Sequence, residues 1–276
     1  MKTNSSSIVC QDLSYQVAGT TLVNKINCQF EIGKISAVLG KNGAGKSTLL
    51  ALLSKELEAT SGDVLFAGTS LHKLTYRQLA KARAVLPQLQ SLVFSIEAQQ
   101  LVQLGAEIGF SEQNLKSCED KIKQVVSQVM LACDIQSLAK RDVLTLSGGE
   151  QKRVQLARVL AQIWPLEKIN NSEPVAFKNR WLLLDEWTNG LDLEHQQTLA
   201  KLFKEWSASG LGVVMVLHDI NLALNLADDV KLLKNGELLL TGKPKTVFTA
   251  DNIQQVLDAQ VWVQELQNGQ TVIVPT

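Results

Sequence analysis

The chain has 276 residues, which is enough for one large domain or for one domain with an inserted lobe. Its residues are 45% hydrophobic and 20% charged, as in an ordinary soluble globular protein. Lysine plus arginine number 27 and aspartate plus glutamate number 27, so the formal net charge is zero. A dedicated nucleic-acid-binding protein usually carries a strongly basic surface, because neutralising phosphates supplies much of its affinity. The composition argues against that class, and we expect no nucleic-acid partner.

The cysteines and the apolar segments indicate the compartment. The sequence has neither a C-x-x-C pair nor a histidine at zinc-finger spacing, so the cysteines are expected to be buried, reduced thiols of a reducing compartment. The residues before Ile8 lack the apolar stretch of a secretory signal, and no run of 18 apolar residues occurs. We therefore expect a cytosolic protein that does not itself cross a membrane. The four cysteines are Cys10, Cys28, Cys118 and Cys133.

The first third of the sequence predicts short strands and one helix. An Ala18-Gly19 turn separates the first two strands, and a glycine-rich loop follows the third. A helix is predicted to begin at Lys46, directly after that loop. The predicted strands are Ile8–Val17, Leu22–Ile32, Ile35–Leu39, Val64–Ala67 and Ala84–Leu86.

The middle of the sequence has a helical pattern. From about Ser95 to Arg141, apolar residues recur at spacings of three and four. A further helix is predicted from about Glu150 to Ile163. The segment Pro165–Asn179 is polar and irregular, so we interpret it as a surface insertion. The apolar residues at helical spacing are Ile122, Val125, Val126, Val129, Met130 and Cys133.

The last third alternates strands with helices and ends in a hairpin. Asn268-Gly269 separates two short apolar runs, and this pair is the one that a type I′ turn favours. The predicted elements are strands Trp181–Asp185, Gly212–Leu217, Val230–Leu233 and Glu237–Leu240, helices Glu194–Ser207 and Ile220–Ala227, and hairpin arms Val261–Gln267 and Gln270–Val274.

This order of elements predicts an α/β fold. Strands that alternate with helices favour a mostly parallel core sheet with helices on its faces. The helical stretch at about 91–145 breaks the alternation, so it is predicted to be an inserted helical subdomain. We expect residues 1–90 and 146–257 to form one catalytic core and residues 258–276 to form a C-terminal β-hairpin.

Residues 40–47 match the phosphate-loop pattern G-x-x-x-x-G-K-[ST], between a predicted strand and a predicted helix. Glycines let backbone N–H groups surround a phosphate, and the helix N-terminus adds about half a positive charge. Lys46 is expected to reach the β- and γ-phosphates, and the Ser47 hydroxyl to ligate Mg²⁺. The pattern predicts a nucleotide phosphate site. Its residues are Gly40, Lys41, Asn42, Gly43, Ala44, Gly45, Lys46, Ser47 and Thr48.

The apolar strand Trp181–Asp185 ends in an acid pair, Asp185 and Glu186. In open α/β sheets ligands lie outside the carboxyl ends of the strands, so both acids are expected to face the phosphates. Asp185 is predicted to hold Mg²⁺ through water, and Glu186 to orient and polarise the attacking water. Taken alone, the pair could also be a solvent-exposed strand cap.

Residues 146–153 read Leu-Ser-Gly-Gly-Glu-Gln-Lys-Arg, and they resemble the signature motif of the ABC superfamily. Ser147, Gly148 and Gly149 at a helix N-terminus would make a second anion site, although Ser-Gly-Gly alone is also an ordinary helix cap. The motif stands between the phosphate loop and the acid pair, which is the order in that superfamily. The resemblance covers about residues 7–257. It implies a P-loop NTPase fold with an antiparallel β subdomain, and hydrolysis of ATP.

The resemblance extends to four further positions. Gln88 looks like the Q-loop glutamine, which contacts Mg²⁺ and water and marks where the permease docks. Asp192 is similar to the acid of the family's D-loop, and His218 looks like the switch histidine that touches the γ-phosphate. Tyr15 is the natural candidate to stack on adenine, and packing in the core is the alternative.

Two positions depart from the family pattern: Glu150 stands where the signature more usually has glutamine, which is a common variant, and the residue after the acid pair departs more clearly. The family usually has proline after the acid pair, and this chain has Trp187. Proline would fix φ, whereas tryptophan adds bulk and flexibility. We expect Trp187 to lie beside the dimer seam, to lose water when two subunits close on ATP, and to tolerate replacement by proline.

Within the superfamily, the chain resembles the hemin-importer ATPases of the iron-chelate and cobalamin uptake group. The likeness lies in segments 83–88, 154–162 and 217–223 and in the insertion after Trp164-Pro165. It implies a homodimer at the cytoplasmic face of a membrane, integral permease partners and, indirectly, a periplasmic substrate-binding protein. A siderophore or cobalamin importer and a soluble ABC ATPase of DNA repair or translation are the alternatives. One cassette without a heptad run argues against the soluble class.

Overall fold

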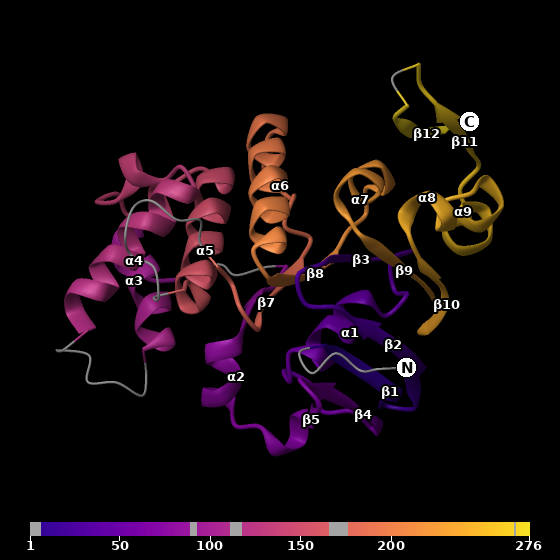
Figure 1. The fold of residues 1–276 in the computed structure, drawn as a ribbon, viewed down its shortest axis with the longest axis horizontal. Helices are drawn as coiled ribbons and strands as arrows, with labels where there is room; N and C mark the ends of the chain where they lie inside the picture. The colour runs from indigo at the N-terminus through magenta and orange to yellow at the C-terminus, as the bar shows by residue number, and fades with distance from the viewer. Residues whose placement is uncertain (1–6, 89–92, 111–117, 166–175, 268) are drawn as a thin grey trace. The chain divides into compact units, whose positions relative to one another are not determined.

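The computed structural model describes residues 7–88, 93–110, 118–165, 176–267 and 269–276. The chain divides into two compact units: Met1–Lys73 together with Val214–Thr276, and Leu74–Val213. Strand β8 (Leu211–Val216) contains the second boundary and therefore belongs to both units. Figure 1 shows the elements of both units in chain order.

The first unit contains an antiparallel sheet in the order β2-β1-β4-β5. Val17 and Thr20 are paired, so Ala18 and Gly19 form a two-residue turn, with φ of 48° and 79°. Positive φ at both positions is what a type I′ hairpin turn requires. The strands are β1 (Ile8–Val17), β2 (Thr20–Phe30), β4 (Ser61–Phe66) and β5 (Thr69–Ser70).

The same unit contains a mostly parallel sheet whose strands run in the order β10-β9-β3-β8. β3 pairs with β9 in parallel, and β9 pairs with β10 antiparallel. Every residue of β3 and of β8 is buried, as expected for strands covered on both faces. The strands are β3 (Ile35–Gly40), β9 (Asp229–Lys234) and β10 (Glu237–Gly242), and the helical elements are α1 (Lys46–Leu53), η1 (Leu71–Lys73), α7 (Ile220–Leu226), α8 (Pro244–Val247) and α9 (Ala250–Leu257).

A C-terminal hairpin of β11 (Val261–Glu265) and β12 (Thr271–Pro275) completes the first unit. Asn221 of α7 donates to the Ile273 carbonyl oxygen at 2.8 Å and accepts from the Ile273 N–H at 2.8 Å. This pair of bonds fastens the hairpin to the unit. Asn268 of the predicted turn lies outside the described residues.

The second unit contains strands in the order β8-β7-β6, of which β7 and β6 pair in parallel, and helices α3, α4 and α5 pack side by side (Figure 1). A Cβ at Gly105 of α3 would lie 1.9 Å from the Arg158 carbonyl oxygen of α5, so glycine permits the close helix contact. Its elements are α2 (Tyr76–Ala82), β6 (Arg83–Leu86), α3 (Ala98–Gly109), α4 (Glu119–Ala132), η3 (Gln136–Leu138), η4 (Val143–Thr145), α5 (Gly148–Ile163), β7 (Arg180–Asp185) and α6 (Leu193–Ala208).

Five aromatic side chains, which we call the aromatic cluster, fill the second unit between α5, β7 and α6. Trp164 meets Phe177 and Trp206 edge to face, at centroid distances of 5.5 and 5.8 Å. Phe203 lies 5.9 Å from Trp206 and 5.0 Å from Trp187. Such edge-to-face pairs add about 0.5–1.5 kcal/mol each to the gain from burial.

The structure confirms the α/β fold and its mostly parallel core sheet, and every predicted strand is present within a few residues of its predicted bounds. The prediction of a surface insertion at Pro165–Asn179 does not hold near its end, because Phe177 is fully buried in the aromatic cluster. Residues 166–175 of that segment lie outside the described residues, and the predicted subdomain bounds at 91–145 stay a prediction. No helix within the described ranges has the length and apolar character needed to span a bilayer.

Candidate active site

The phosphate loop connects β3 to α1 in the first unit. Gly43 and Gly45 have φ of 79° and 95°, the left-handed region that glycine adopts without strain. A Cβ at Gly45 would lie 2.3 Å from the Leu22 carbonyl oxygen, and one at Gly40 would lie 2.4 Å from the Leu233 carbonyl oxygen. The loop is therefore pressed against neighbouring backbone, and no larger residue fits at either position.

Lys46 starts α1 and places its charge on the loop. The side chain is buried, and its Nζ donates to the carbonyl oxygens of Gly40 at 2.9 Å and Lys41 at 3.0 Å. Ser47, in the first turn, is exposed, and Thr48 is half-buried. The first N–H groups of a helix have no intrahelical partner, so this end attracts anions. A buried ammonium beside such N–H groups suits the phosphates of a nucleotide.

An exposed ion cluster anchors the outer side of the phosphate loop. Asp258 accepts from Lys41 Nζ at 2.9 Å and from Lys234 Nζ at 3.1 Å. The hydrogen bond from Lys41, followed by the one from Lys234, lowers the pKa of Asp258. Exposed pairs of this kind contribute little to stability, so the cluster connects Lys41 of the loop to the residue after α9 without adding much to the stability of the fold.

Two further predicted residues lie in the first unit. Tyr15 is half-buried on β1, opposite Val23 of β2. His218 is exposed and follows β8, and Asp219 beside it accepts from the Leu222 N–H at 3.0 Å as the cap of α7. Contact of Tyr15 with adenine and of His218 with a γ-phosphate stay predictions.

The acid pair ends β7 in the second unit. Asp185 is 6% exposed, and Glu186 has a left-handed backbone with φ of 49°. The Oε2 atom of Glu186 accepts from Gln88 Nε2 at 2.6 Å and from Asn189 Nδ2 at 2.7 Å. Two amide groups thus fix one oxygen of this carboxylate, which contradicts the alternative of a strand cap turned freely to solvent. The structure places Gln88 beside Glu186.

Lys152 is a neighbour of the acid pair that the sequence did not single out. Burial lowers the pKa of this lysine, and the charges of Asp185 and Glu186 oppose that shift. Its ammonium therefore lies in the field of both carboxylates. The available signal was its position three residues after Gly149, within the signature motif on the first turns of α5.

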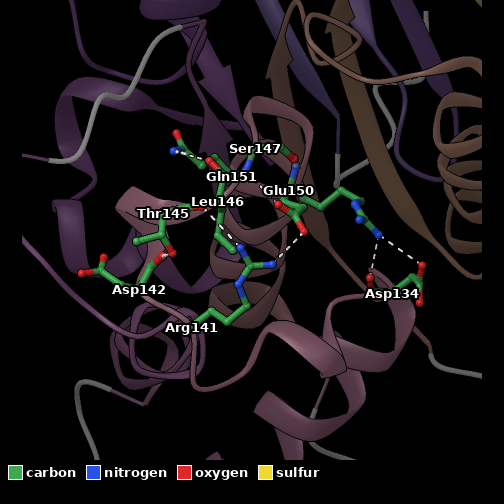
Figure 2. A network of polar contacts seen from close by, with 9 residues as sticks. Asp134, Arg141, Asp142, Thr145, Leu146, Ser147, Glu150 and Gln151 are labelled. Carbon is green, nitrogen blue, oxygen red and sulfur yellow. Dashed lines mark hydrogen bonds and ion pairs between the residues drawn. The ribbon is translucent and has the colours of Figure 1, made fainter.

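The signature motif forms the N-terminal cap of α5 (Figure 2). The Glu150 N–H donates to Ser147 Oγ at 3.3 Å, and the Ser147 N–H donates to Glu150 Oε2 at 2.7 Å. This reciprocal pair is a capping box. Arg141 reaches Glu150 at 3.2 Å, and the bond from the Ser147 N–H is the largest influence lowering the pKa of Glu150. The glutamate that stands where the signature usually has glutamine thus has a structural role.

The predicted D-loop leads into α6. Asp192 caps that helix, accepting from the His195 N–H at 2.9 Å and lying 2.6 Å from the His195 ring Nδ1. The bond from the His195 N–H lowers the pKa of Asp192. A Cβ at Gly149 would lie 2.9 Å from the Gly190 carbonyl oxygen, so the signature and the D-loop approach closely within one chain. A role of Asp192 at a nucleotide stays a prediction.

The expectation that Trp187 loses water when two subunits close on ATP is wrong, and its place beside a dimer seam stays a prediction. The indole is 1% exposed and packs edge to face on Phe203, at a centroid distance of 5.0 Å. It has no water to lose, because the chain turns it inward to the aromatic cluster as soon as β7 ends. Within the described residues, its Nε1 has no hydrogen-bond partner.

The sequence profile of the ABC transporter family matches residues 23–166. That match covers more than half of the chain and includes the phosphate loop, Gln88 and the signature. The chain belongs to the ABC transporter family. It is 37% identical to the hemin import ATP-binding protein HmuV of Escherichia coli O157:H7, over 93% of this chain and 94% of the relative. It is 40% identical to the protein of the same name from Gloeobacter violaceus, over 91% and 87%.

Solved structures agree on the fold of this ABC cassette. A dimeric bacterial ABC transporter cassette superimposes with a TM-score of 0.72, at 23% sequence identity, and covers 86% of this chain and 98% of its own. This likeness shows that the chain has the fold of an ABC cassette.

Each unit of this ABC family member contains its own set of predicted residues. The first unit holds the phosphate loop, Tyr15 and His218, and the second holds the acid pair, Gln88, the signature and Asp192. The first set provides an anion site, and the second provides a fixed carboxylate beside a buried one. These are the chemical groups that binding and hydrolysis of a nucleoside triphosphate need.

Proposed function

We propose that this chain is the ATP-hydrolysing subunit of an ABC importer, and that the cargo of the transporter is hemin. The observation that carries the hydrolytic role is the Glu186 carboxylate, held by Gln88 at 2.6 Å and by Asn189 at 2.7 Å. A carboxylate whose direction is fixed by two amides can accept a proton from a water molecule at a defined position. The names of the relatives support the cargo.

The residues of the phosphate loop fit the phosphates of ATP. Gly40 and Gly45 lie where a Cβ would collide with backbone, so the loop keeps its N–H groups close together. Lys46 supplies one positive charge at the start of α1, and the helix N-terminus adds to it. In this proposal Lys46 binds the β- and γ-phosphates, and Glu186 polarises the water that attacks the γ-phosphorus.

The donor set also suits Mg²⁺, which prefers oxygen ligands and neutralises phosphate charge when bound. We propose the Ser47 hydroxyl, the Gln88 side-chain oxygen and the Asp185 carboxylate, through water, as its ligands. Asp185 is buried at the end of β7 and is the acid with the least access to bulk water in the pair. In this proposal the negative charge of Asp185 attracts Mg²⁺, and Glu186 accepts a proton from the attacking water.

We further propose that two copies of this chain form a homodimer through their nucleotide sites. In each site one subunit supplies Lys46, and its partner supplies Ser147, Gly148 and Gly149 at the start of α5. Such a dimer at the cytoplasmic face of a membrane would drive integral permease subunits, with a periplasmic substrate-binding protein upstream. A dimeric neighbour in fold and the importers among the relatives support this assembly.

Replacing Glu186 by glutamine tests the hydrolytic role. The amide has the same shape, and its oxygen can still accept from Gln88, but it cannot take a proton. Phosphate release should fall by about 10²–10⁴-fold, because that is what a positioned general base contributes. ATP binding should persist, so the variant should elute as an ATP-dependent dimer in gel filtration.

Glu194→Gln is the matched control, since Glu194 is an exposed acid in the first turn of α6. It should hydrolyse ATP at the rate of the unsubstituted protein. Turnover by Glu186→Gln at that same rate would refute the assigned role.

The cargo is tested on the assembled transporter, because the substrate never touches this subunit. The chain should be purified with its permease and reconstituted in vesicles, and ATP hydrolysis measured with binding protein loaded with hemin, ferric siderophore or cobalamin. Stimulation by hemin alone is expected. Stimulation by one of the other two cargoes would replace hemin and leave the ATPase assignment standing.

A further inference from the structure

Cys10 and Cys28 lie directly opposite each other on two antiparallel strands. Cys10 is on β1 and Cys28 on β2, and the register pairs their Cα atoms. Opposed residues in such a pair have Cα atoms about 4.5–5.5 Å apart and side chains on the same face of the sheet. A disulfide needs Cα atoms about 4.4–6.8 Å apart. The two strands already provide the backbone spacing of a disulfide.

The side chains of Cys10 and Cys28 are close enough for a hydrogen bond between them to be the largest influence on the pKa of each thiol. That bond, followed by burial, raises the pKa of Cys10 well above its ordinary value. The same bond lowers the pKa of Cys28, and Lys231 lowers it further, against the effect of burial. The pair therefore divides into a thiolate-forming sulfur on Cys28 and a proton-holding sulfur on Cys10.

A buried lysine provides the positive charge beside this pair. Lys231 on β9 is 1% exposed, forms an ion pair with Asp229 and lies 4.4 Å from the centroid of the Phe30 ring. Asp229 also accepts from Ser36 Oγ at 2.5 Å. The lysine is thus held in place by groups of its own unit, and its field acts on both thiols.

The solvent exposure of the cysteines also favours Cys28 as the thiol that reacts first. Cys28 is partly exposed, whereas Cys10, Cys118 and Cys133 are buried. Burial raises the pKa of Cys133 to about 12, so that thiol forms almost no thiolate at neutral pH. Only the thiolate is a strong nucleophile, and an oxidant in solution reaches Cys28 first.

We propose that Cys10 and Cys28 form a modification site, at which a hydroperoxide oxidises Cys28 and Cys10 then closes a disulfide between β1 and β2. In the first step the Cys28 sulfur attacks the peroxide oxygen. An S–O bond forms, the O–O bond breaks and the leaving oxygen departs as an alkoxide, or as hydroxide when the oxidant is hydrogen peroxide. That anion takes a proton from solvent to become the alcohol or water. The product is a sulfenic acid on Cys28.

In the second step the Cys10 sulfur attacks the Cys28 sulfur. The S–S bond forms, the S–O bond breaks and hydroxide leaves with the Cys10 proton as water. Conversion of Cys28 to a neutral sulfenic acid removes the thiolate charge that holds the proton on Cys10, while Lys231 remains. The two sulfurs lose two electrons in total, and the peroxide gains two.

Peptide mapping of the whole protein tests the site. The protein is treated with hydrogen peroxide, its remaining thiols are alkylated, and it is digested with trypsin. Cleavage after Lys25 separates Cys10 from Cys28, so a disulfide appears as one cross-linked product of peptides 3–25 and 26–34, two hydrogens lighter than their sum. Dithiothreitol should reverse it. Recovery of both peptides as separate alkylated species would overturn the proposal.

Serine variants separate the two roles. Cys10→Ser should accumulate sulfenic acid on Cys28, trapped by dimedone, and Cys28→Ser should leave Cys10 unmodified. Cys133→Ser is the matched control and should form the cross-link as the unsubstituted protein does. Oxidation of Cys133 or Cys118 as fast as Cys28 would also overturn the proposal, since it would show that position and charge confer no selectivity.

Discussion

At the scale of single residues, Trp187 shows how a buried neighbour can hold the backbone of Glu186, the proposed general base. It directly follows Glu186, and its indole is packed on Phe203 at 5.0 Å within the aromatic cluster. Glu186 has a left-handed backbone, with φ of 49°, which costs most L-residues about 1–2 kcal/mol. The packing of the next side chain offsets that cost. Proline, the family's usual residue here, would fix the backbone through its ring instead.

Removing the indole should therefore destabilise the protein. Trp187→Pro empties a fully buried site in the aromatic cluster, and exchanges of a core Trp or Phe for a small residue cost about 3–5 kcal/mol. Trp187→Phe should cost less, because the ring still meets Phe203 and the indole N–H, which has no partner among the described residues, is gone. Urea unfolding monitored by circular dichroism measures both losses.

A Trp187→Pro protein as stable as the unsubstituted one would contradict this account. It would mean that the aromatic cluster closes around the vacated volume without loss.

The residue types alone were enough to predict the phosphate loop and the acid pair. The direction in which the Trp187 side chain points could not be predicted from the sequence. The pattern at 40–47 specifies its conformation locally, since the glycines at 43 and 45 are needed for positive φ. The direction of Trp187 depends on Phe203, which lies more than ten residues further along the chain, packs on the indole only after folding and itself packs on Trp206. The proximity of Lys152 to the acid pair depends in the same way on the packing of α5.

At the scale of elements, the start of α5 depends on one hydroxyl. Ser147 is the N-cap, and two glycines follow it, which have the poorest helix propensity after proline. Ser147→Ala removes the bond to the Glu150 N–H and should lower the free energy of unfolding by about 0.5–2 kcal/mol. Ser147→Asn should restore most of it, because asparagine caps as well as serine.

The urea concentrations at the unfolding midpoints of the three proteins measure this effect, provided that their m-values are equal. Equal stability of Ser147→Ala and the unsubstituted protein would show that Glu150 alone holds the helix start. A fall in ATP-dependent dimerisation for Ser147→Asn, with stability restored, would separate the capping role of the hydroxyl from its proposed contact with nucleotide.

Most elements could be predicted from the sequence, but several short helices could not. The predicted strand Ile8–Val17 and the helix that starts at Lys46 are confirmed. Helix α2 was not predicted because it has seven residues and one buried side chain, although Thr75 and Gln78 form a capping box that a T-x-x-Q pattern indicates. Helix α9 has strong amphipathic character but only two buried residues, so its sequence reads as a polar run.

At the scale of the whole molecule, nucleotide should stabilise the fold. Mg-ATP at 100 times its Kd should raise the free energy of unfolding by about 2.7 kcal/mol. For a chain of this size that corresponds to several degrees in Tm, at about 2–4 °C for each kcal/mol. Lys46→Ala should abolish the shift, since it removes the only buried ammonium that the described loop places at the start of α1.

Lys34→Ala is the control, because Lys34 is an exposed lysine that precedes β3 and lies outside the loop. It should show the full shift, measured by differential scanning calorimetry with and without Mg-ATP. An equal shift in Lys46→Ala would contradict the assignment of the phosphate site.

The left-handed backbone of Glu186 also limits which amino acids can replace it during evolution. Glycine adopts that conformation without strain, and asparagine and aspartate tolerate it far better than valine, isoleucine or threonine. None of the three tolerated residues reproduces the reach and basicity of glutamate at this site. A lineage that no longer needed hydrolysis would therefore be expected to fix glycine, asparagine or aspartate here, while the β-branched residues would be removed for their effect on folding. The positive φ at this position therefore limits the substitutions by which a descendant of this cassette could become inactive and still fold.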